Sequence, residues 1–177
     1  MGKQQQRLDV DGKEIPVKDW KEVERMDWDS YFASMVEIVK LRSTCLRHQF
    51  GALVALNNKI RGTGYNGAPR GLPHCLDVGC IRDRLGIPSG TQHEICMAVH
   101  AEVNAILQAL TFGDLEGATL YTNSFPCRIC ARIIINSGVR RLVSSGTYSD
   151  VEGLELLKKA GIEVKFLKLD KTIFERI

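Results

Sequence analysis

Helix-like and strand-like stretches alternate from residue 98 to the C-terminus, and this alternation limits the possible folds more than any other feature of the chain. The expected elements are helices at 100–110, 126–138 and 150–161 and strands at 118–124, 140–146 and 162–169. Strands that alternate with helices in sequence usually form a largely parallel sheet with helices on both faces. The pattern therefore predicts an α/β fold.

The first third of the chain predicts an amphipathic helix followed by a β-hairpin. DWDSYFASMVEIVKLRSTC begins with Asp27 and Asp29, either of which can cap a helix. Its apolar stripe is formed by Phe32, Met35, Val36 and Val39. QFGALVALNNKIRGTGYNG is typical of two strands joined by a tight turn at 57–58. Residues 1–26 are polar and charged, so we interpret them as an N-terminal arm and residues 27–177 as a single domain.

Composition and charge argue against several classes of protein. The 177 residues include 24 basic and 21 acidic side chains, and the net charge of +3 is too small to indicate a nucleic-acid partner. No apolar run is long enough to cross a membrane, and the polar start MGKQQQRLDVDGKEIP lacks the apolar core of a signal peptide. We therefore expect a cytoplasmic location, where six cysteines near histidines favour metal binding over disulfides.

Residues 67–97 form an insert of a different kind. The stretch is rich in Gly, Pro, Cys and His and shows no sustained periodicity. Such a long irregular segment is uncommon in a compact domain unless it is functional or held in place. Its cysteines and histidines are the candidates for holding it, because metal coordination can supply the ordering energy that a small apolar content cannot.

Two short motifs carry the chemistry of a catalytic metal site. In PCRIC, Cys127 and Cys130 can reach one ion from a helix N-terminus, where the partial positive charge favours thiolates. His100 in AVHAEVNAIL would be a third ligand and would leave the fourth tetrahedral position to water, as in catalytic zinc sites. Zinc lowers the pKa of bound water to roughly 7. Glu102 can lie beside the metal without binding it and carry protons to a substrate.

Each motif has a simpler interpretation when it is taken alone. A CxxC pair is also typical of a redox-active site or of two buried small residues, and His100 can be a helix cap. The combination of H-x-E with P-C-x-x-C is far more restrictive, because it is the pattern of the zinc nucleobase deaminases. The two motifs together therefore predict a zinc-dependent deaminase.

With both motifs in place, the chain resembles the cytidine deaminase-like superfamily and, within it, the deoxycytidylate (dCMP) deaminases, including the late-competence proteins of that family. HAE and PCxxC carry the resemblance to the superfamily, and GYNGAPRG points to the dCMP deaminases. The matching segments cover most of residues 42–165. The resemblance implies a three-layer α/β/α sandwich around a mixed five-stranded sheet of strand order 2-1-3-4-5, with the first two strands antiparallel.

The resemblance also implies hydrolysis of dCMP to dUMP and ammonia, which would supply dUMP for the synthesis of dTMP. Water activated by the zinc ion would attack C4 of the cytosine. Glu102 would protonate N3 and then help the amine to leave. The backbone N–H of Ala101 would hold the base carbonyl, and the tetrahedral carbon is what the site should bind best.

The same resemblance suggests how the rest of the nucleotide is held. Asn66 in GYNG would contact the deoxyribose, and Tyr148 in GTYSD matches an aromatic residue near the substrate. Recognition of the phosphate needs a cation. Arg47, just before the first strand, is the first candidate, ahead of Lys59 and Arg70.

Some dCMP deaminases carry a second, structural zinc ion, held by a Cys before the first strand and by a Cys and a His in the insert. Here these positions correspond to Cys45, Cys75 and His93. Cys96 or Cys80 would complete the tetrahedron. His93 and Cys96 are separated by two residues, whereas close relatives often have this pair adjacent, so the sequence leaves the fourth ligand open.

The family also implies partners and competing functions. dCTP as activator and dTTP as inhibitor are expected effectors, and we expect a homo-oligomer, a hexamer or a dimer, with no membrane or nucleic-acid partner. One alternative is a tRNA adenosine deaminase, which would need a basic surface. Another is a deaminase of a free base or nucleoside, although cytidine deaminases usually have Cys where His100 stands. A non-catalytic zinc-stabilised module is the third, and there Glu102 would have no role.

Overall fold

The computed structural model describes residues 10–13, 25–146 and 151–170. Its centre is a five-stranded sheet in the order β2-β1-β3-β4-β5, which confirms the predicted topology. The strands are β1 (Gly51–Leu56), β2 (Lys59–Tyr65), β3 (Ala118–Thr122), β4 (Val139–Ser144) and β5 (Glu163–Phe166). None of the helices in the described ranges has the length and apolar character that a membrane crossing requires.

The sheet is mixed, and the expectation of a largely parallel sheet holds only for its second half. β1 is antiparallel to both of its neighbours, β2 and β3, whereas β3, β4 and β5 are parallel. The hairpin turn reverses the chain between β1 and β2. The crossover from β2 then places β3 on the other side of β1, parallel to β2 and therefore antiparallel to β1.

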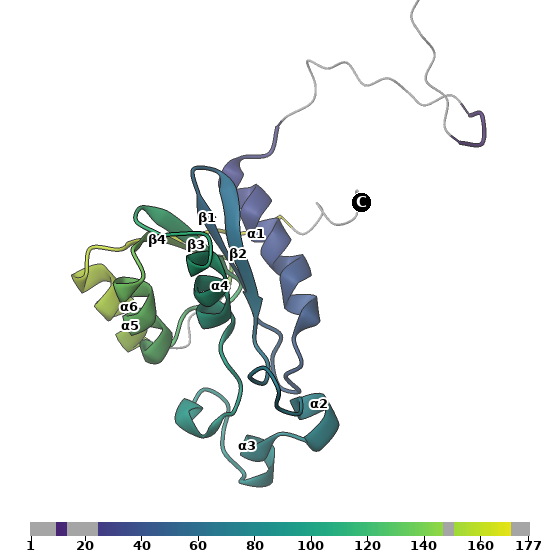
Figure 1. Cartoon of the computed structure of the whole chain (residues 1–177), viewed down its shortest axis with the longest axis vertical. Helices are drawn as coiled ribbons and strands as arrows, with labels where there is room; N and C mark the ends of the chain where they lie inside the picture. The colour runs from purple at the N-terminus through teal and green to yellow at the C-terminus, as the bar shows by residue number, and fades with distance from the viewer. Residues whose placement is uncertain (1–9, 14–24, 147–150, 171–177) are drawn as a thin grey trace, which may run out of the picture.

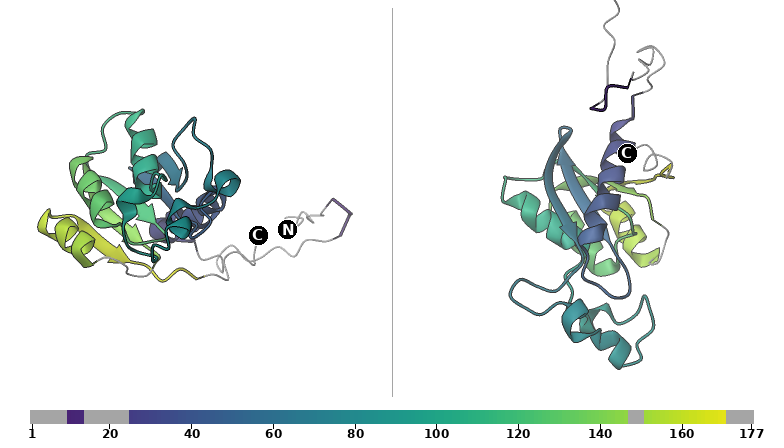
Figure 2. Two further views of the ribbon diagram at one scale, coloured as in Figure 1. Left: turned by 90° about the horizontal axis from the view of Figure 1, so that it is seen from below. Right: turned by 90° about the vertical axis from the view of Figure 1, so that its right-hand side faces the viewer.

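Helices cover both faces of the sheet, as the three-layer prediction requires (Figures 1 and 2). One face carries α1 (Trp28–Val39), and the other carries α4 (Ala101–Leu110), α5 (Arg128–Asn136) and α6 (Val151–Lys159). Side chains alternate along β1, because successive residues of a strand point to opposite faces. Leu53 packs in the cluster under α1, and Ala52 and Val54 pack in the larger cluster under α4 and α5.

Most of the predicted boundaries are confirmed to within a few residues, with one correction. Asp27 is the cap of α1, since its side chain accepts hydrogen bonds from the backbone N–H groups of Asp29 and Ser30. The second predicted helix of the alternating series begins at Arg128, so Pro126 precedes the helix and does not lie in its first turn. Cys127 takes the N-cap position instead, with an extended backbone.

Two glycines of β2 let α4 lie directly against the sheet. A Cβ atom at Gly62 would lie 2.5 Å from the carbonyl oxygen of Ala105, and one at Gly64 would collide with the carbonyl oxygen of Ala101. Real Cβ atoms do not approach backbone atoms this closely. The absence of side chains at these two positions therefore fixes the height of α4 above the sheet, and with it the position of the residues at the start of that helix.

The insert packs against one end of the sheet and outside the three layers (Figure 1). It contains α2 (Cys75–Val78), α3 (Ile81–Arg84) and the short 3-10 helix η3 (His93–Ile95), and a further 3-10 helix, η2 (Lys40–Arg42), follows α1. Arg47 joins the insert to the body of the domain, because its guanidinium group donates to Asp83 Oδ1 and to the carbonyl oxygen of Ile87, each at 2.7 Å. Most of the expected N-terminal arm lies outside the described residues.

A buried carboxylate ties α1 to the far strands of the sheet. The side chain of Asp29 accepts two hydrogen bonds from Arg141, at 2.7 and 2.8 Å, and one from Lys165 at 2.7 Å. Tyr121 donates a further bond at 3.0 Å. These bonds, that from Arg141 above all, hold the pKa of Asp29 well below its usual range. Asp29 was only a candidate helix cap in the sequence, and its long-range partners were not predicted.

Replacing this carboxylate should destabilise the fold. We expect Asp29→Asn to lower the free energy of unfolding by about 3 kcal/mol, because Arg141 loses its bidentate carboxylate partner and keeps only the exposed Glu163, and Lys165 loses its partner as well. Since folding lowers the pKa of Asp29, its contribution is complete above pH ~4 and is lost as the pH falls further. Urea unfolding between pH 3 and 7 measures both effects. The exposed Glu155→Gln is the control, and an equal loss in both variants would contradict the prediction.

Candidate metal centre and cavity

The predicted metal ligands meet where two helices begin. His100 is the N-cap of α4, Cys127 is the N-cap of α5, and Cys130 lies in the first turn of α5. Each helix N-terminus presents unpaired backbone N–H groups and a partial positive charge, which stabilises nearby thiolates. The site lies beyond the carboxyl ends of β2 and β3, where ligands usually bind in open α/β sheets.

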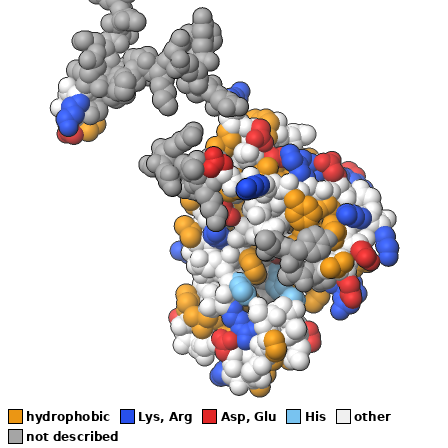
Figure 3. Space-filling model, turned by 180° about the vertical axis from the view of Figure 1, so that it is seen from behind, with side chains coloured by type: hydrophobic (Ala, Val, Ile, Leu, Met, Phe, Trp, Pro, Cys, Tyr) orange, Lys and Arg blue, Asp and Glu red, His pale blue; other side chains and the backbone are white. Residues whose placement is uncertain are grey.

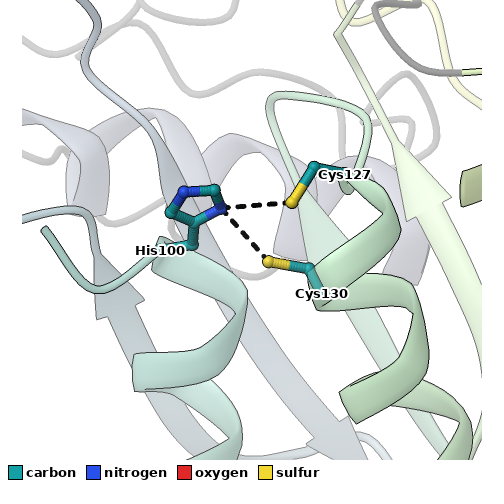
Figure 4. Close-up of side chains that lie close together, drawn as sticks. All are labelled: His100, Cys127 and Cys130. Atoms are coloured by element: carbon teal, nitrogen blue, oxygen red, sulfur yellow. Dashed lines mark hydrogen bonds between the residues drawn. The ribbon is translucent and has the colours of Figure 1, made fainter. Parts of the chain in front are cut away.

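The three side chains have the spacing of a metal site (Figure 4). His100 Nδ1 lies 3.2 Å from Cys130 Sγ and 3.5 Å from Cys127 Sγ, and all three ligand atoms are within 4.8 Å of one another. Zinc bonds of about 2.0 Å to nitrogen and 2.3 Å to sulfur in tetrahedral geometry separate N and S by about 3.5 Å. The donor set and its spacing therefore fit a zinc ion, with Nδ1 as the histidine ligand.

The protonation of the cluster also favours metal binding. The hydrogen bond from Cys130 lowers the pKa of Cys127 to about 3, and the bond with His100 adds to this effect. The same hydrogen bond, together with burial, raises the pKa of Cys130. A hydrogen bond with Cys127 raises the pKa of His100, against burial and the positive charge of Arg82, which lower it. The lowered pKa of Cys127 favours the thiolate, the form that binds a metal ion.

Glu102 lies beside this cluster and is not part of the group of three ligands. Its side chain is 3 % exposed, and its Oε2 atom is 3.8 Å from Cys130 Sγ. Burial is the main cause that raises the pKa of this carboxyl group. A buried carboxyl group next to a metal site, with a raised pKa, suits proton transfer at neutral pH.

A cavity of about 330 Å³ opens between the metal cluster and the insert. Of the predicted substrate-binding side chains, those of Asn66 and Arg47 line it, together with His100, Glu102 and Cys127. Histidine side chains gather where the body of the domain meets the insert, with basic side chains beside them (Figure 3). The insert therefore forms one wall of the site and is not a remote appendage.

Asn66 directly follows β2 and is largely used by the protein itself. Its Oδ1 atom accepts hydrogen bonds from Ser43 Oγ at 2.6 Å and from the backbone N–H of Phe50 at 2.8 Å. Its Nδ2 atom donates to the carbonyl oxygen of His48 at 2.9 Å. The side chain thereby fixes the segment before β1, and one N–H of its amide is left for a ligand.

The other residues predicted to contact the substrate differ in where the structure places them. Ala101 is the first residue of α4, so its backbone N–H lies in the helix turn that has no intrahelical acceptor. Lys59 begins β2 at the hairpin turn and does not line the cavity, and neither does Arg70. Tyr148 lies outside the described residues.

The candidate ligands of the second metal line the same cavity, but they do not form a ready site. Their side chains are those of Cys45, Cys75, His93 and Cys96, together with the alternative Cys80. Among the described residues, the group of three that brings its ligand atoms within 4.8 Å is His100, Cys127 and Cys130, and no group from the insert does so. The ring of His93 packs edge-on against that of His100, with 5.7 Å between their centroids.

The sequence prediction missed several residues of the cavity, and the charged side chain among them is Arg82 in α3. Its side chain lines the cavity and is 7 % exposed. A short irregular segment has no periodicity that would distinguish a buried arginine from a solvated one. The neighbouring prolines and cysteines gave no signal for it.

Fold and site together define a class, the cytidine deaminase-like proteins with a zinc-type ligand group at two helix N-termini. A comparison with protein families narrows this class. The cytidine and deoxycytidylate deaminase zinc-binding region matches residues 26–145. The chain belongs to this family.

Individual relatives agree with the family assignment. The chain is 33 % identical over 85 % of its length to deoxycytidylate deaminase of Schizosaccharomyces pombe, and 42 % identical over 67 % of its length to that of Mycobacterium phage D29. It covers 94 % of the phage protein and 47 % of the S. pombe protein, about half. The dCMP deaminase of cyanophage S-TIM5, solved with dCMP and dUMP, is 26 % identical with a TM-score of 0.63, over 77 % of this chain and 94 % of that one.

Removal of one ligand should empty the metal site. We expect His100→Ala to contain about one zinc ion per chain fewer than the unchanged protein, because two sulfurs alone hold the ion weakly. Elemental analysis of the purified protein measures this loss. His48→Ala changes another histidine of the same cavity and should keep its zinc. Equal zinc contents in the two variants would refute the assignment of His100.

Proposed function

We propose that this protein is a zinc-dependent deaminase that hydrolyses dCMP to dUMP and ammonia. The observation that carries the proposal is the buried Glu102 beside the His100, Cys127 and Cys130 cluster, in a cavity large enough for a ligand. The deoxycytidylate deaminases among the relatives, and the S-TIM5 enzyme that binds dCMP and dUMP, support this substrate. The dUMP formed would supply the synthesis of dTMP.

The residues of the chain would divide the work as follows. Bound at the cluster, zinc would lower the pKa of a water molecule toward ~7. Glu102 takes a proton from this water, delivers it to N3 of the cytosine and assists departure of the amine from C4. The backbone N–H of Ala101 orients the base through its carbonyl oxygen. The oxygen of the water adds to C4, which becomes tetrahedral, and the C–N bond then breaks, so that dCMP and water give dUMP and ammonia.

Contacts outside the base would select the nucleotide. Asn66 offers its remaining amide N–H to the deoxyribose. Arg47 lies at the junction of the insert and the body of the domain and lines the cavity, so it is proposed to approach the phosphate. Tyr148 keeps its proposed place near the substrate as a prediction from the sequence.

The alternative substrates have less support. A tRNA-binding deaminase would need a basic surface, and the net charge of this chain is +3. The insert walls the cavity and leaves less room for a macromolecular substrate. Ammonia release decides between the candidates, measured with dCMP, dCTP, cytidine, guanine and a tRNA anticodon stem as substrates. We expect release from dCMP, and preferential release from any of the others would overturn the proposal.

Glu102 should be needed for turnover and not for metal binding. We expect Glu102→Gln to keep its zinc and to lose about 10²- to 10⁴-fold in kcat, because the amide cannot transfer protons. Zinc content and ammonia release from dCMP are measured on the same sample. Full activity in this variant would refute the proton-transfer role of Glu102. Loss of zinc would instead indicate that Glu102 supports the metal site.

We also propose a second, structural zinc ion that orders the insert. Its ligands are Cys45, Cys75, His93 and Cys96, with Cys80 as the alternative to one of them. Support comes from proximity: Cys45, Cys80 and Cys96 line the same cavity as Cys75 and lie near enough for their charges to act on its thiol. No three of these ligand atoms lie within 4.8 Å of one another, so the side chains would have to move closer together to bind an ion.

Zinc content tests the second site directly. We expect about two zinc ions per chain in the unchanged protein and about one in Cys75→Ser, with a lower melting temperature because the insert loses its ordering. Cys127→Ser is the matched variant, since it removes a thiol from the other cluster. A single ion per chain in the unchanged protein would exclude the structural zinc.

Regulation and assembly are proposed from the family resemblance. We propose dCTP as activator and dTTP as inhibitor of a homo-oligomer, a hexamer or a dimer. A cytoplasmic location is proposed as well, consistent with six cysteines that form no disulfide.

A further inference from the structure

Arg82 is a buried cation without a counter-ion. Only 7 % of the residue is exposed, and no carboxylate of the described part of the chain lies within ion-pair distance of its guanidinium group. Its Nη2 atom donates to the carbonyl oxygens of Pro88 at 2.8 Å and Thr91 at 2.6 Å. Its Nε atom is buried and has no hydrogen-bond partner.

This arrangement costs free energy unless an anion completes it. A buried charge is strongly unfavourable unless it is paired, and two carbonyl oxygens do not neutralise a guanidinium group. Two half-buried arginines differ in this respect, because Arg141 has Asp29 and Arg47 has Asp83. The half-buried Arg61 also has an unpartnered Nε atom, but it does not line the cavity. Of the two arginines that line the cavity, Arg82 is therefore the one whose charge is left for a ligand.

The position of Arg82 limits where that ligand can be. Its side chain lines the cavity that also contains His100 and Glu102, and its charge acts on His100. The two carbonyl bonds hold the guanidinium group in place before a ligand arrives, so little side-chain freedom is lost on binding. A fixed guanidinium fork matches the geometry of a phosphate group.

We propose that Arg82 binds the 5′-phosphate of the substrate and is the main determinant of nucleotide over nucleoside. The inference rests on the proposed nucleotide substrate. Arg47, which the sequence favoured for this role, is already paired with Asp83 and bonded to the carbonyl oxygen of Ile87. It holds the wall of the cavity on which Arg82 stands, and its buried Nη1 atom, which has no hydrogen-bond partner, is a secondary contact.

Binding measurements without turnover test this assignment. The parent is the full chain with zinc and the Glu102→Gln substitution, and calorimetry gives its dissociation constants for dCMP and for deoxycytidine, which lacks the phosphate. We expect Arg82→Met to raise the dissociation constant of dCMP by about 10- to 100-fold, because a charge-assisted hydrogen bond to the phosphate is lost. The dissociation constant of deoxycytidine should change by less than about 3-fold. Arg82→Lys keeps the charge and should give an intermediate loss for dCMP.

Controls separate this role from a structural one. Arg84→Met removes an exposed arginine from the same helix and should leave both constants unchanged. If Arg82 only supports the loop at 88–91, its variants weaken the binding of dCMP and of deoxycytidine equally. An unchanged ratio of the two dissociation constants therefore overturns the proposal. If Arg82→Met does not fold, the ratio of the same two dissociation constants in Arg82→Lys tests the proposal. A parent and an unchanged protein that bind no dCMP would instead overturn the proposed function, and this assignment with it.

Discussion

The convergence of two helix N-termini at one edge of the sheet is the constraint on which the site depends. α4 can begin beside α5 only because Gly62 and Gly64 let it lie against β2. The crossover then carries the chain to β3, whose carboxyl end leads into α5. His100 and Cys127 both take the N-cap position, where the backbone leaves the extended conformation and the side chains point away from the helix body. The metal cluster is therefore a product of how the layers pack.

The insert changes this widespread α/β arrangement into an enclosed site. It adds the wall opposite the metal cluster, and it is joined to the domain by Arg47 and by the contact between His48 and Ser89. The same wall brings the second group of cysteines to the cavity. The proposed structural zinc and the proposed phosphate contact thus belong to one segment, and such a double role would account for a long irregular stretch in a small domain.

The cavity combines a buried carboxyl group with a cation that has no carboxylate partner. Glu102 is the carboxyl group beside the metal cluster, and burial raises its pKa. Arg82 supplies the positive charge, whereas Arg47 is paired with Asp83. An anionic substrate suits this combination, because the cation can pair with its charged group while the carboxyl group handles protons. The net charge of the chain does not indicate this arrangement, because the arrangement depends on where the charges lie and not on their sum.

The sequence alone determined the alternation of helices and strands and the clustering of His100, Cys127 and Cys130, because these depend on local periodicity and on short, specific spacings. It left the cap of α1 open between Asp27 and Asp29, and the structure decided for Asp27. Only the tertiary structure decided the antiparallel pairing of β1 with β3, the ring contact of His93 with His100, and the absence of Lys59 and Arg70 from the cavity lining. It also revealed Arg82. The physical reason is that burial and the absence of a counter-ion are properties of surroundings that meet only after the chain has folded, and no spacing along the chain encodes them.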